Sequence, residues 1–150
     1  MTSPLAISGF ARKVLAFAFV LGPAAAAQRP TWTIGPFTKP GGMNPIIAPS
    51  GASAIRSPFN DSLVRWEEYA TFNPAAVVRD GKVYVLYRAE DATGDSAIGH
   101  HTSRLGLAES ADGLHFTRRT TPVLYPDRDA QRQNEWTGGV EDPRIVERDD

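Results

Sequence analysis

An internal repeat is the feature of this sequence that most restricts its fold. The stretches "NPAAVVRDGK" (73–82) and "DPRIVERDD" (142–150) both start with a short polar residue and a proline, continue as a largely apolar run and reach Arg-Asp. Six positions match at one offset of 69 residues, which indicates two copies of one structural unit. The matched pairs are Asn73 and Asp142, Pro74 and Pro143, Ala76 and Ile145, Val77 and Val146, Arg79 and Arg148, and Asp80 and Asp149.

Two Asp-Gly pairs predict that the first copy belongs to a β-sheet. Asp80-Gly81 and Asp112-Gly113 each separate two short runs rich in β-branched and aromatic residues, and Asp-Gly is a strong predictor of a hairpin turn. Four consecutive antiparallel strands make about one blade of a β-propeller. No stretch beyond residue 27 shows a capped helical period, so we expect little helix. The predicted strands are 74–78, 83–89, 103–110 and 114–118.

The second copy, from Glu141 onward, is expected to open the next blade. Because a repeat unit cannot bury both of its faces alone, we expect residues 67–150 to be an incomplete propeller with more blades beyond residue 150. The chain alone is then expected to be partly folded or aggregation-prone, and inactive. The alternative is a complete all-β domain whose edge strand ends at residue 150, although such an edge would be unprotected.

The first 27 residues (1–27) have the pattern of a cleaved signal peptide. A positive segment, Arg12-Lys13, precedes an apolar run at 14–27 that ends in small residues suited to cleavage. A retained membrane anchor is the alternative, but it needs about 20 apolar residues. We therefore expect export to the periplasm or the extracellular space, with no membrane contact after cleavage. Residues 28–66 are rich in Pro, Gly and Ser and are predicted to form an irregular N-terminal arm or a disordered linker.

Charge and cysteine content exclude several classes of function. Removing Arg12 and Lys13 from the 16 basic residues leaves 14 against 17 acidic ones, so no nucleic-acid partner is expected. The chain has no cysteine, which excludes disulfides, thiol catalysis and zinc–thiolate sites. His100 and His101 are adjacent and point to opposite faces of an extended chain, so we predict no metal site there.

Polar residues at the ends of the predicted strands are the candidate site. The repeat places Asn73 and Asp142 at equivalent positions on neighbouring blades, so both are expected to face one hollow. An amide, a carboxylate and an arginine such as Arg88 suit a polyhydroxylated ligand, because they accept from and donate to hydroxyl groups. Cleavage of a glycosidic bond requires a proton donor, and the attacking group is either phosphate or a water activated by a second carboxylate. The simpler alternative is that Glu141 pairs with Arg144 and that Arg88 is solvated.

Three motifs, in this order, resemble glycoside hydrolase family 130, the β-mannoside phosphorylases and hydrolases. They are "NPAAVVRDGKVYVLYRAE" (73–90), "SRLGLAESADGLHF" (103–116) and "GGVEDPRIV" (138–146), and the resemblance covers about residues 57–150. It implies a five-bladed β-propeller that cleaves β-linked mannosides with inversion, by phosphorolysis or hydrolysis. The implied partner is a β-mannoside oligosaccharide. No cofactor or metal is implied, only inorganic phosphate as co-substrate of a phosphorylase.

The resemblance also implies roles for individual residues. Asp142 would be the proton donor, acting through a sugar hydroxyl. The mannosyl unit would be held by Asn73, Arg88 and Arg104, with Glu141 and Arg144 in support. The segment 90–104 is longer than the connection expected between the motifs of Arg88 and Arg104. Residues that hold phosphate, or a hydrolytic base, would lie beyond residue 150.

Two other functions compete with this one. A non-catalytic carbohydrate-binding propeller would keep the same pocket. A five-bladed enzyme of the arabinanase or invertase type would need an acidic base where Asn73 stands, and an amide cannot act as a base. Export favours hydrolysis over phosphorolysis, because a phosphorylated sugar made outside the cell would have to be recaptured.

Overall fold

The computed structural model describes residues 30–94 and 99–148. The chain divides into two compact units, residues 1–37 and residues 38–150. The second unit carries the regular secondary structure of the described residues.

The first unit is described only at residues 30–37, so the predicted signal peptide (1–27) lies outside the described residues. The described residues of this unit form no helix or strand, and they expose the side chains of Trp32, Ile34 and Phe37. Across both described ranges, no helix has the length and apolar character needed to cross a membrane.

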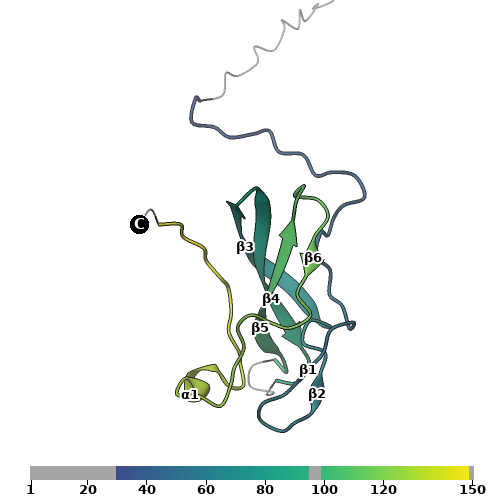
Figure 1. Ribbon diagram of the computed structural model, residues 1–150, viewed down its shortest axis with the longest axis vertical. Helices are drawn as coiled ribbons and strands as arrows, with labels where there is room; N and C mark the ends of the chain where they lie inside the picture. Colours follow the sequence, from purple (N-terminus) through teal and green to yellow (C-terminus); the bar gives the residue numbers. More distant parts are fainter. Residues whose placement is uncertain (1–29, 95–98, 149–150) are drawn as a thin grey trace, which may run out of the picture. The chain divides into compact units, whose positions relative to one another are not determined.

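A four-stranded antiparallel sheet forms the centre of the second unit (Figure 1). Strands that are neighbours in the sequence are also neighbours in the sheet, so the sheet is a simple meander. The predicted all-β class is confirmed, and within the described residues the only helix is α1 (Arg132–Glu135). The strands are β3 (Ala70–Arg79), β4 (Lys82–Asp91), β5 (Thr102–Ser110) and β6 (Thr117–Arg118).

The turn between β3 and β4 is the predicted two-residue turn. Arg79 pairs with Lys82, and the two residues between them, Asp80 and Gly81, have φ angles of 51° and 73°. Two left-handed residues in succession match the right-handed twist of the flanking strands, which is why Asp-Gly fits here.

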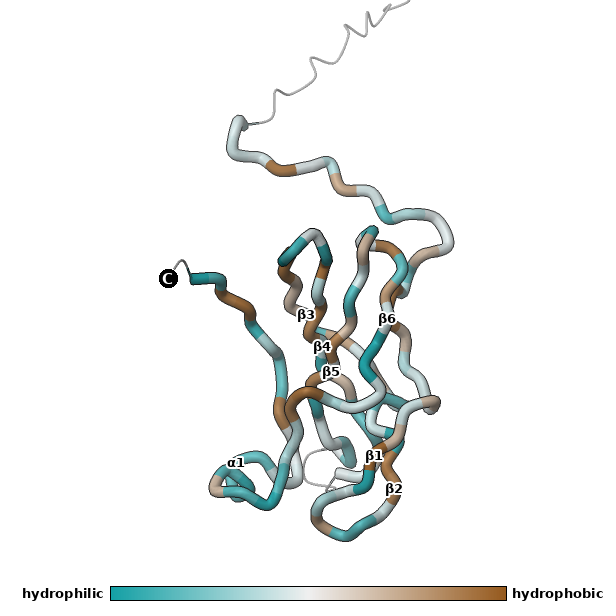
Figure 2. The backbone as a smooth tube through the Cα atoms, viewed as in Figure 1, coloured by the Kyte–Doolittle hydropathy of each residue, from teal (hydrophilic) through white to brown (hydrophobic). Residues whose placement is uncertain are grey.

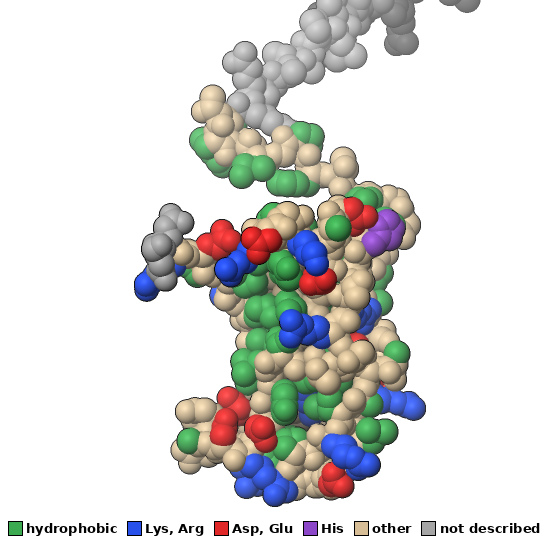
Figure 3. Space-filling model, in the orientation of Figure 1, with side chains coloured by type: hydrophobic (Ala, Val, Ile, Leu, Met, Phe, Trp, Pro, Cys, Tyr) green, Lys and Arg blue, Asp and Glu red, His purple; other side chains and the backbone are tan. Residues whose placement is uncertain are grey.

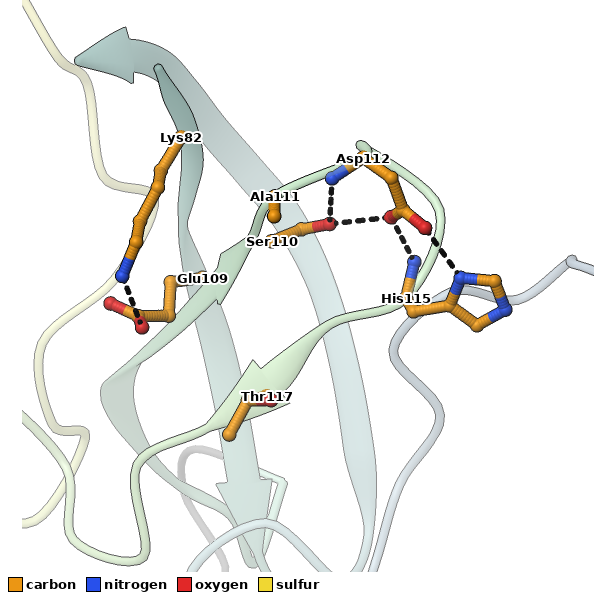
Figure 4. A pocket seen from close by; sticks show the side chains of 7 residues that line it. All are labelled: Lys82, Glu109, Ser110, Ala111, Asp112, His115 and Thr117. Carbon is orange, nitrogen blue, oxygen red and sulfur yellow. Dashed lines mark hydrogen bonds and ion pairs between the residues drawn. The ribbon is translucent and has the colours of Figure 1, made fainter. Parts of the chain in front are cut away.

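The second hairpin differs from the prediction, because β6 begins at Thr117 and not at residue 114. The Asp112 carboxylate accepts hydrogen bonds from the backbone N–H groups of Leu114 and His115, both at 2.8 Å. Its other oxygen lies 2.7 Å from Nδ1 of His115 (Figure 4). This side chain therefore engages backbone donors that a longer strand would have paired across the sheet.

The region predicted to be an irregular arm (28–66) contains a short hairpin at its C-terminal end. β1 (Ile55–Arg56) pairs antiparallel with β2 (Leu63–Val64). Val64 and the nearby Trp66 are buried in the core, with exposed fractions of 3% and 0%. This end of the arm is therefore part of the packed unit and not a linker.

The hydrophobic core lies against one face of the sheet. Alternate residues of β4 point into it, as the period of two in a strand requires, and they meet Trp66. Figure 2 shows hydrophobic residues in the central strands, where this core lies. The β4 residues in this hydrophobic core are Val85, Tyr87 and Ala89.

One buried carboxylate, Glu67, has two partners at the core. The Tyr87 hydroxyl donates a 2.8 Å hydrogen bond to Glu67, and Nη1 of Arg118 donates to the same carboxylate oxygen at 3.1 Å. Burial and the bond to Glu67 raise the pKa of Tyr87, so the phenol stays protonated. Gly106 faces the Tyr87 ring, and a Cβ at this position would lie 2.3 Å from the ring carbon Cζ, so a side chain there would displace the ring.

The second copy of the sequence repeat does not form a strand. Residues 141–148 have no regular secondary structure, so the prediction that Glu141 opens a strand is wrong for the described residues. A strand requires a neighbour that pairs with its backbone N–H and C=O groups, and no described strand lies beside this segment.

Candidate functional site

Asn73 and Asp142 have the same backbone conformation. Their φ angles are 45° and 46°, in the left-handed region that Asn and Asp tolerate better than most residues, and each precedes a proline. At this one position the two copies therefore resemble each other in the backbone as well as in the sequence. Nδ2 of Asn73 donates a 2.8 Å hydrogen bond to Oδ1 of Asp142, so the two copies meet at these residues.

A β-bulge positions the first copy. The register between β3 and β4 shifts between Phe72 and Ala75, which leaves Asn73 and Pro74 outside the ladder. Bulges redirect side chains at the ends of pairing. The proline, which has no N–H to offer, causes no loss of a ladder hydrogen bond at this position.

A close approach to β5 positions the second copy. The Ser103 N–H donates to the Gly138 carbonyl at 2.9 Å, and the Val140 N–H donates to the Ser103 carbonyl at 3.0 Å. Gly139, between them, has a φ of 101°, and a Cβ there would lie 2.1 Å from the Ser103 carbonyl oxygen. Only glycine permits this contact, which fixes the chain two residues before Glu141.

Arg88 of β4 connects the second copy to the sheet. Its Nη1 lies 2.8 Å from Oε2 of Glu141 and 3.3 Å from Oδ1 of Asp142. Its Nη2 donates to Glu90 at 2.6 Å and its Nε donates to Oγ of Ser103 at 3.0 Å. One edge of the guanidinium is thus held within the sheet, while the other faces the exposed carboxylates of the second copy.

The surroundings of Arg88 keep it charged. Its Cζ lies 4.7 Å from the centroid of the Phe72 ring, a cation–π contact. Only 16% of the Arg88 side chain is exposed, and burial alone would lower its pKa. The bond to Glu90 and the charges of Glu141 and Glu90 outweigh burial and raise the pKa of Arg88.

Asp142 is ionised in this state. The hydrogen bond from Asn73 lowers the pKa of the Asp142 carboxyl most, and Arg88 and the charge of Arg144 lower it further. Both hydrogen bonds fall on Oδ1, and among the described residues Oδ2 has no hydrogen-bond partner. The side chain is 42% exposed, so this second oxygen is available to a ligand.

The simpler alternative for Glu141 and Arg144 does not apply. Glu141 pairs with Arg88 and not with Arg144. Arg144 instead donates through Nη1 to two backbone carbonyls, those of Asp142 at 3.3 Å and Pro143 at 2.9 Å. Arg144 therefore braces the backbone that carries Asp142.

The structure does not bring Arg104 to this cluster. Arg88 is paired across the sheet with Leu105, and Ala89 with Arg104, so the two arginine side chains leave opposite faces of the sheet. Arg104 is 3% exposed and forms an ion pair with Asp91, which is fully buried. Burial lowers the pKa of Arg104 to about 10.

Three residues that contact Arg88 were not among the predicted site residues: Phe72, Glu90 and Ser103. The contact with Glu90 could have been predicted, since residues two apart in a strand share a face and an Arg and a Glu at that spacing can pair. The contact of Ser103 with Arg88 depends on the register of β5 against β4. That register could not be predicted, because a long segment separates the two strands in the sequence. The contact of Phe72 with Arg88 depends on the bulge that follows Phe72.

The cluster presents hydrogen-bonding groups of three kinds on an accessible surface: an amide, carboxylates and a guanidinium. These groups can bind sugar hydroxyls, and a carboxyl can donate or accept a proton. In the view of Figure 3, charged side chains of both signs also gather at another place, the end of the sheet that carries the turn between β3 and β4. In the described ranges, no group of three or more His, Cys, Asp or Glu side chains is arranged to hold a metal.

A family profile described as beta-1,4-mannooligosaccharide phosphorylase matches residues 43–150. Two curated relatives come from Thermoanaerobacter sp. (strain X514). A 1,2-beta-oligomannan phosphorylase is 39% identical over 84 residues, which is 56% of this chain and 27% of the relative. A beta-1,2-mannobiose phosphorylase is 34% identical over 101 residues, which is 63% of this chain and 31% of the relative.

Solved structures agree with these relatives. One comes from work on family 130 glycoside hydrolases that target β-1,2-mannosidic linkages in Candida mannan. It is 54% identical with a TM-score of 0.71, over 77% of this chain and 32% of that one. A glycosyl hydrolase from Bacteroides ovatus is 50% identical with a TM-score of 0.72, over 79% and 33%. The chain thus spans about a third of the length of these proteins, and it belongs to glycoside hydrolase family 130.

Proposed function

We propose that the protein containing this chain cleaves β-linked mannosides with inversion, and that Asp142 supplies the proton. The observation that carries this proposal is the contact between Asn73 and Asp142, two repeat-related residues, with Arg88 bound to the same oxygen of Asp142. Membership of family 130 supports the substrate class, since the relatives are mannoside phosphorylases and hydrolases.

The lowered pKa of Asp142 has to be reconciled with acid catalysis. A carboxyl that is ionised before substrate binds cannot donate a proton until its pKa rises. The largest cause of the lowering is the hydrogen bond from Asn73. A sugar hydroxyl that accepts from Nδ2 of Asn73 would remove that cause, so substrate binding itself would return Asp142 toward its protonated form. Arg88 and Asn73 would then hold the mannosyl unit, with Glu141 and Arg144 in support.

We propose β-1,2-linked mannosides as the first substrates to test. Both curated relatives are named for β-1,2-mannans, and the structure that is 54% identical comes from work on hydrolases of β-1,2 linkages. The relatives that are phosphorylases use phosphate as co-substrate. The higher identity to the hydrolase structure, together with the predicted export, favours water as the attacking group in this protein.

We also propose that the sheet β3–β6 is one blade of a five-bladed propeller. Its four strands follow one another in the order that a blade requires. Val78 of β3 and Val146 of the second copy are 68% and 88% exposed, and a neighbouring blade would cover such apolar side chains. Residues 1–27 would be a signal peptide, which would direct the protein to the periplasm or the extracellular space.

The test is a product assay on the full-length protein with β-1,2- and β-1,4-mannobiose, each with and without inorganic phosphate. We expect free mannose from the β-1,2-linked substrate without phosphate. Mannose 1-phosphate formed only with phosphate would show a phosphorylase instead. A protein that binds mannobiose and cleaves neither substrate would be a carbohydrate-binding propeller, and the proposal would be wrong.

A further inference from the structure

We propose that Glu90 and Ser103 are positioning residues for the sugar site, because they hold the guanidinium of Arg88 in the one orientation in which Nη1 faces Asp142 and a bound hydroxyl. This inference rests on the proposed function, which it extends to residues that would touch neither the sugar nor the attacking group.

The three side chains form a closed triangle inside the sheet. Glu90 accepts through Oε1 from Nη2 of Arg88 at 2.6 Å, and Ser103 accepts from Nε of Arg88 at 3.0 Å. The Ser103 hydroxyl donates in turn to the same oxygen of Glu90 at 3.1 Å. The side chain of Glu90 is 8% exposed and Ser103 is 1% exposed, so water does not compete for these bonds. With Phe72 against its flat face, the guanidinium has little freedom to rotate.

Ser103 ties this triangle to the second copy of the repeat. Its side chain holds Arg88, while its backbone N–H and C=O hold Gly138 and Val140. One residue of β5 therefore sets the position of Arg88 and the position of the segment that leads to Asp142. A displacement of Ser103 would move both partners of the contact.

Glu90 also contributes charge. The groups around Asp142 are Arg88 and, behind it, Glu90 from β4, the neutral Asn73 from β3, and Glu141 and Arg144 from its own segment. The negative charge of Glu90 offsets part of the positive charge of Arg88. Removing it would leave the guanidinium to stabilise the ionised form of Asp142 more strongly, so the pKa of Asp142 would fall.

The experiment uses four variants of the full-length protein: Glu90→Gln, Ser103→Ala and two controls. Glu67→Gln is a control matched for burial, because Glu67 is a buried carboxylate that accepts from Arg118 and Tyr87 away from Arg88. The readouts are KM for β-1,2-mannobiose, Tm, and the pKa of Asp142 from carboxyl NMR of protein labelled with ¹³C-aspartate. Glu109→Gln, which breaks the exposed pair with Lys82 (Figure 4), is a second control for loss of one negative charge from the sheet.

Glu90→Gln is expected to lower the pKa of Asp142 by about half a unit and to raise KM about threefold. Ser103→Ala is expected to raise KM by a similar factor without moving that pKa, since it removes a bond but no charge. Glu67→Gln should lower Tm and change neither quantity.

The inference is overturned if Glu90→Gln leaves the pKa of Asp142 unchanged, or if Glu67→Gln or Glu109→Gln moves it equally. If the wild-type protein cleaves no mannoside while Glu90→Gln still shifts Asp142, the proposed function fails and the positioning of Arg88 stands. The two failures are therefore distinguishable.

Discussion

Two arginines on opposite faces of one sheet, Arg88 and Arg104, show how similar pairs acquire different uses. Each lies beside a carboxylate of β4, Glu90 in one case and Asp91 in the other. Arg104 and Asp91 are buried in the core, so their charges interact with each other and not with a ligand. Arg88 keeps one edge toward water, where it meets Glu141 and Asp142. Partial exposure, and not the presence of an ion pair, makes the Arg88 face a candidate site.

The largest expected effect is on the exposed face. Asp142→Asn should lower kcat about 10³-fold, because proton donation is lost, while mannobiose affinity stays within several-fold because the amide still forms hydrogen bonds. Tm should be unchanged. Steady-state kinetics and calorimetric binding on the full-length protein check this.

Asp61→Asn is the matched control for that substitution. Asp61 also has a left-handed backbone, with a φ of 58°, and an exposed pair with an arginine, 3.3 Å from Arg56. It should retain wild-type kinetics. Unchanged turnover in Asp142→Asn would remove this residue from the acid role.

Substitutions on the buried face should lower stability more than substitutions on the exposed face. Arg104→Met leaves the carboxylate of Asp91 uncompensated in the core, and we expect the free energy of unfolding to fall by about 3–5 kcal/mol. Arg88→Met should cost less, about 1–3 kcal/mol, because the carboxylates of Glu141 and Asp142 reach water and the buried Glu90 keeps its hydrogen bond from Ser103. Denaturant melts of the two variants test the contrast. Equal losses, or a greater loss for Arg88→Met, would contradict this account of the two faces.

Gly139, which allows the second copy to approach β5 closely, should be required for the position of Asp142. Gly139→Ala places a Cβ against the Ser103 backbone, so residues 138–140 must move and carry Asp142 with them. We expect kcat/KM to fall about 100-fold, since small displacements of reacting groups are costly. Gly113→Ala is the control, with a positive φ of 74° but its nearest neighbour at 3.8 Å. If both variants lose the same activity, backbone strain and not crowding at Ser103 is responsible.

The smallest effect concerns the pKa of Asp142. Asn73→Gly removes the hydrogen bond that lowers this pKa most, and glycine tolerates the left-handed backbone there. The pKa should rise, so the acid stays protonated to a higher pH. The alkaline limb of kcat/KM should therefore move up by a few tenths of a pH unit. A limb that moves down would show that Asn73 does not act on Asp142 in this way.

Local sequence patterns predicted the fold where one residue type decides the backbone. Asp80-Gly81 predicted a turn that the structure confirms. The match of Asn73 with Asp142 predicted that both face one hollow, and in the structure the two side chains are hydrogen-bonded. The second hairpin was misjudged because Asp112 could bind its own backbone or lead into a strand, and the sequence does not distinguish the two. The strand expected after Glu141 was not predictable from that segment, because a strand forms only where a neighbouring strand pairs with it.

The site was predictable in part for a similar reason. Asn73, Arg88, Glu141 and Asp142 come together because the repeat and the strand ends bring them together. Arg104 lies on the other face because strand parity depends on the register of β5, and a shift of one residue moves a side chain across the sheet. Nothing in the residues 90–104 sets that register in the sequence.

A crystal structure of the full-length Asp142→Asn variant with β-1,2-mannobiose tests the central claim most directly. The account predicts a mannosyl unit within hydrogen-bond distance of Asn73, Arg88 and the amide at position 142, with Arg104 still paired to Asp91 beneath the sheet. A sugar bound on the face of Arg104, or bound out of reach of both Asn73 and position 142, would contradict it.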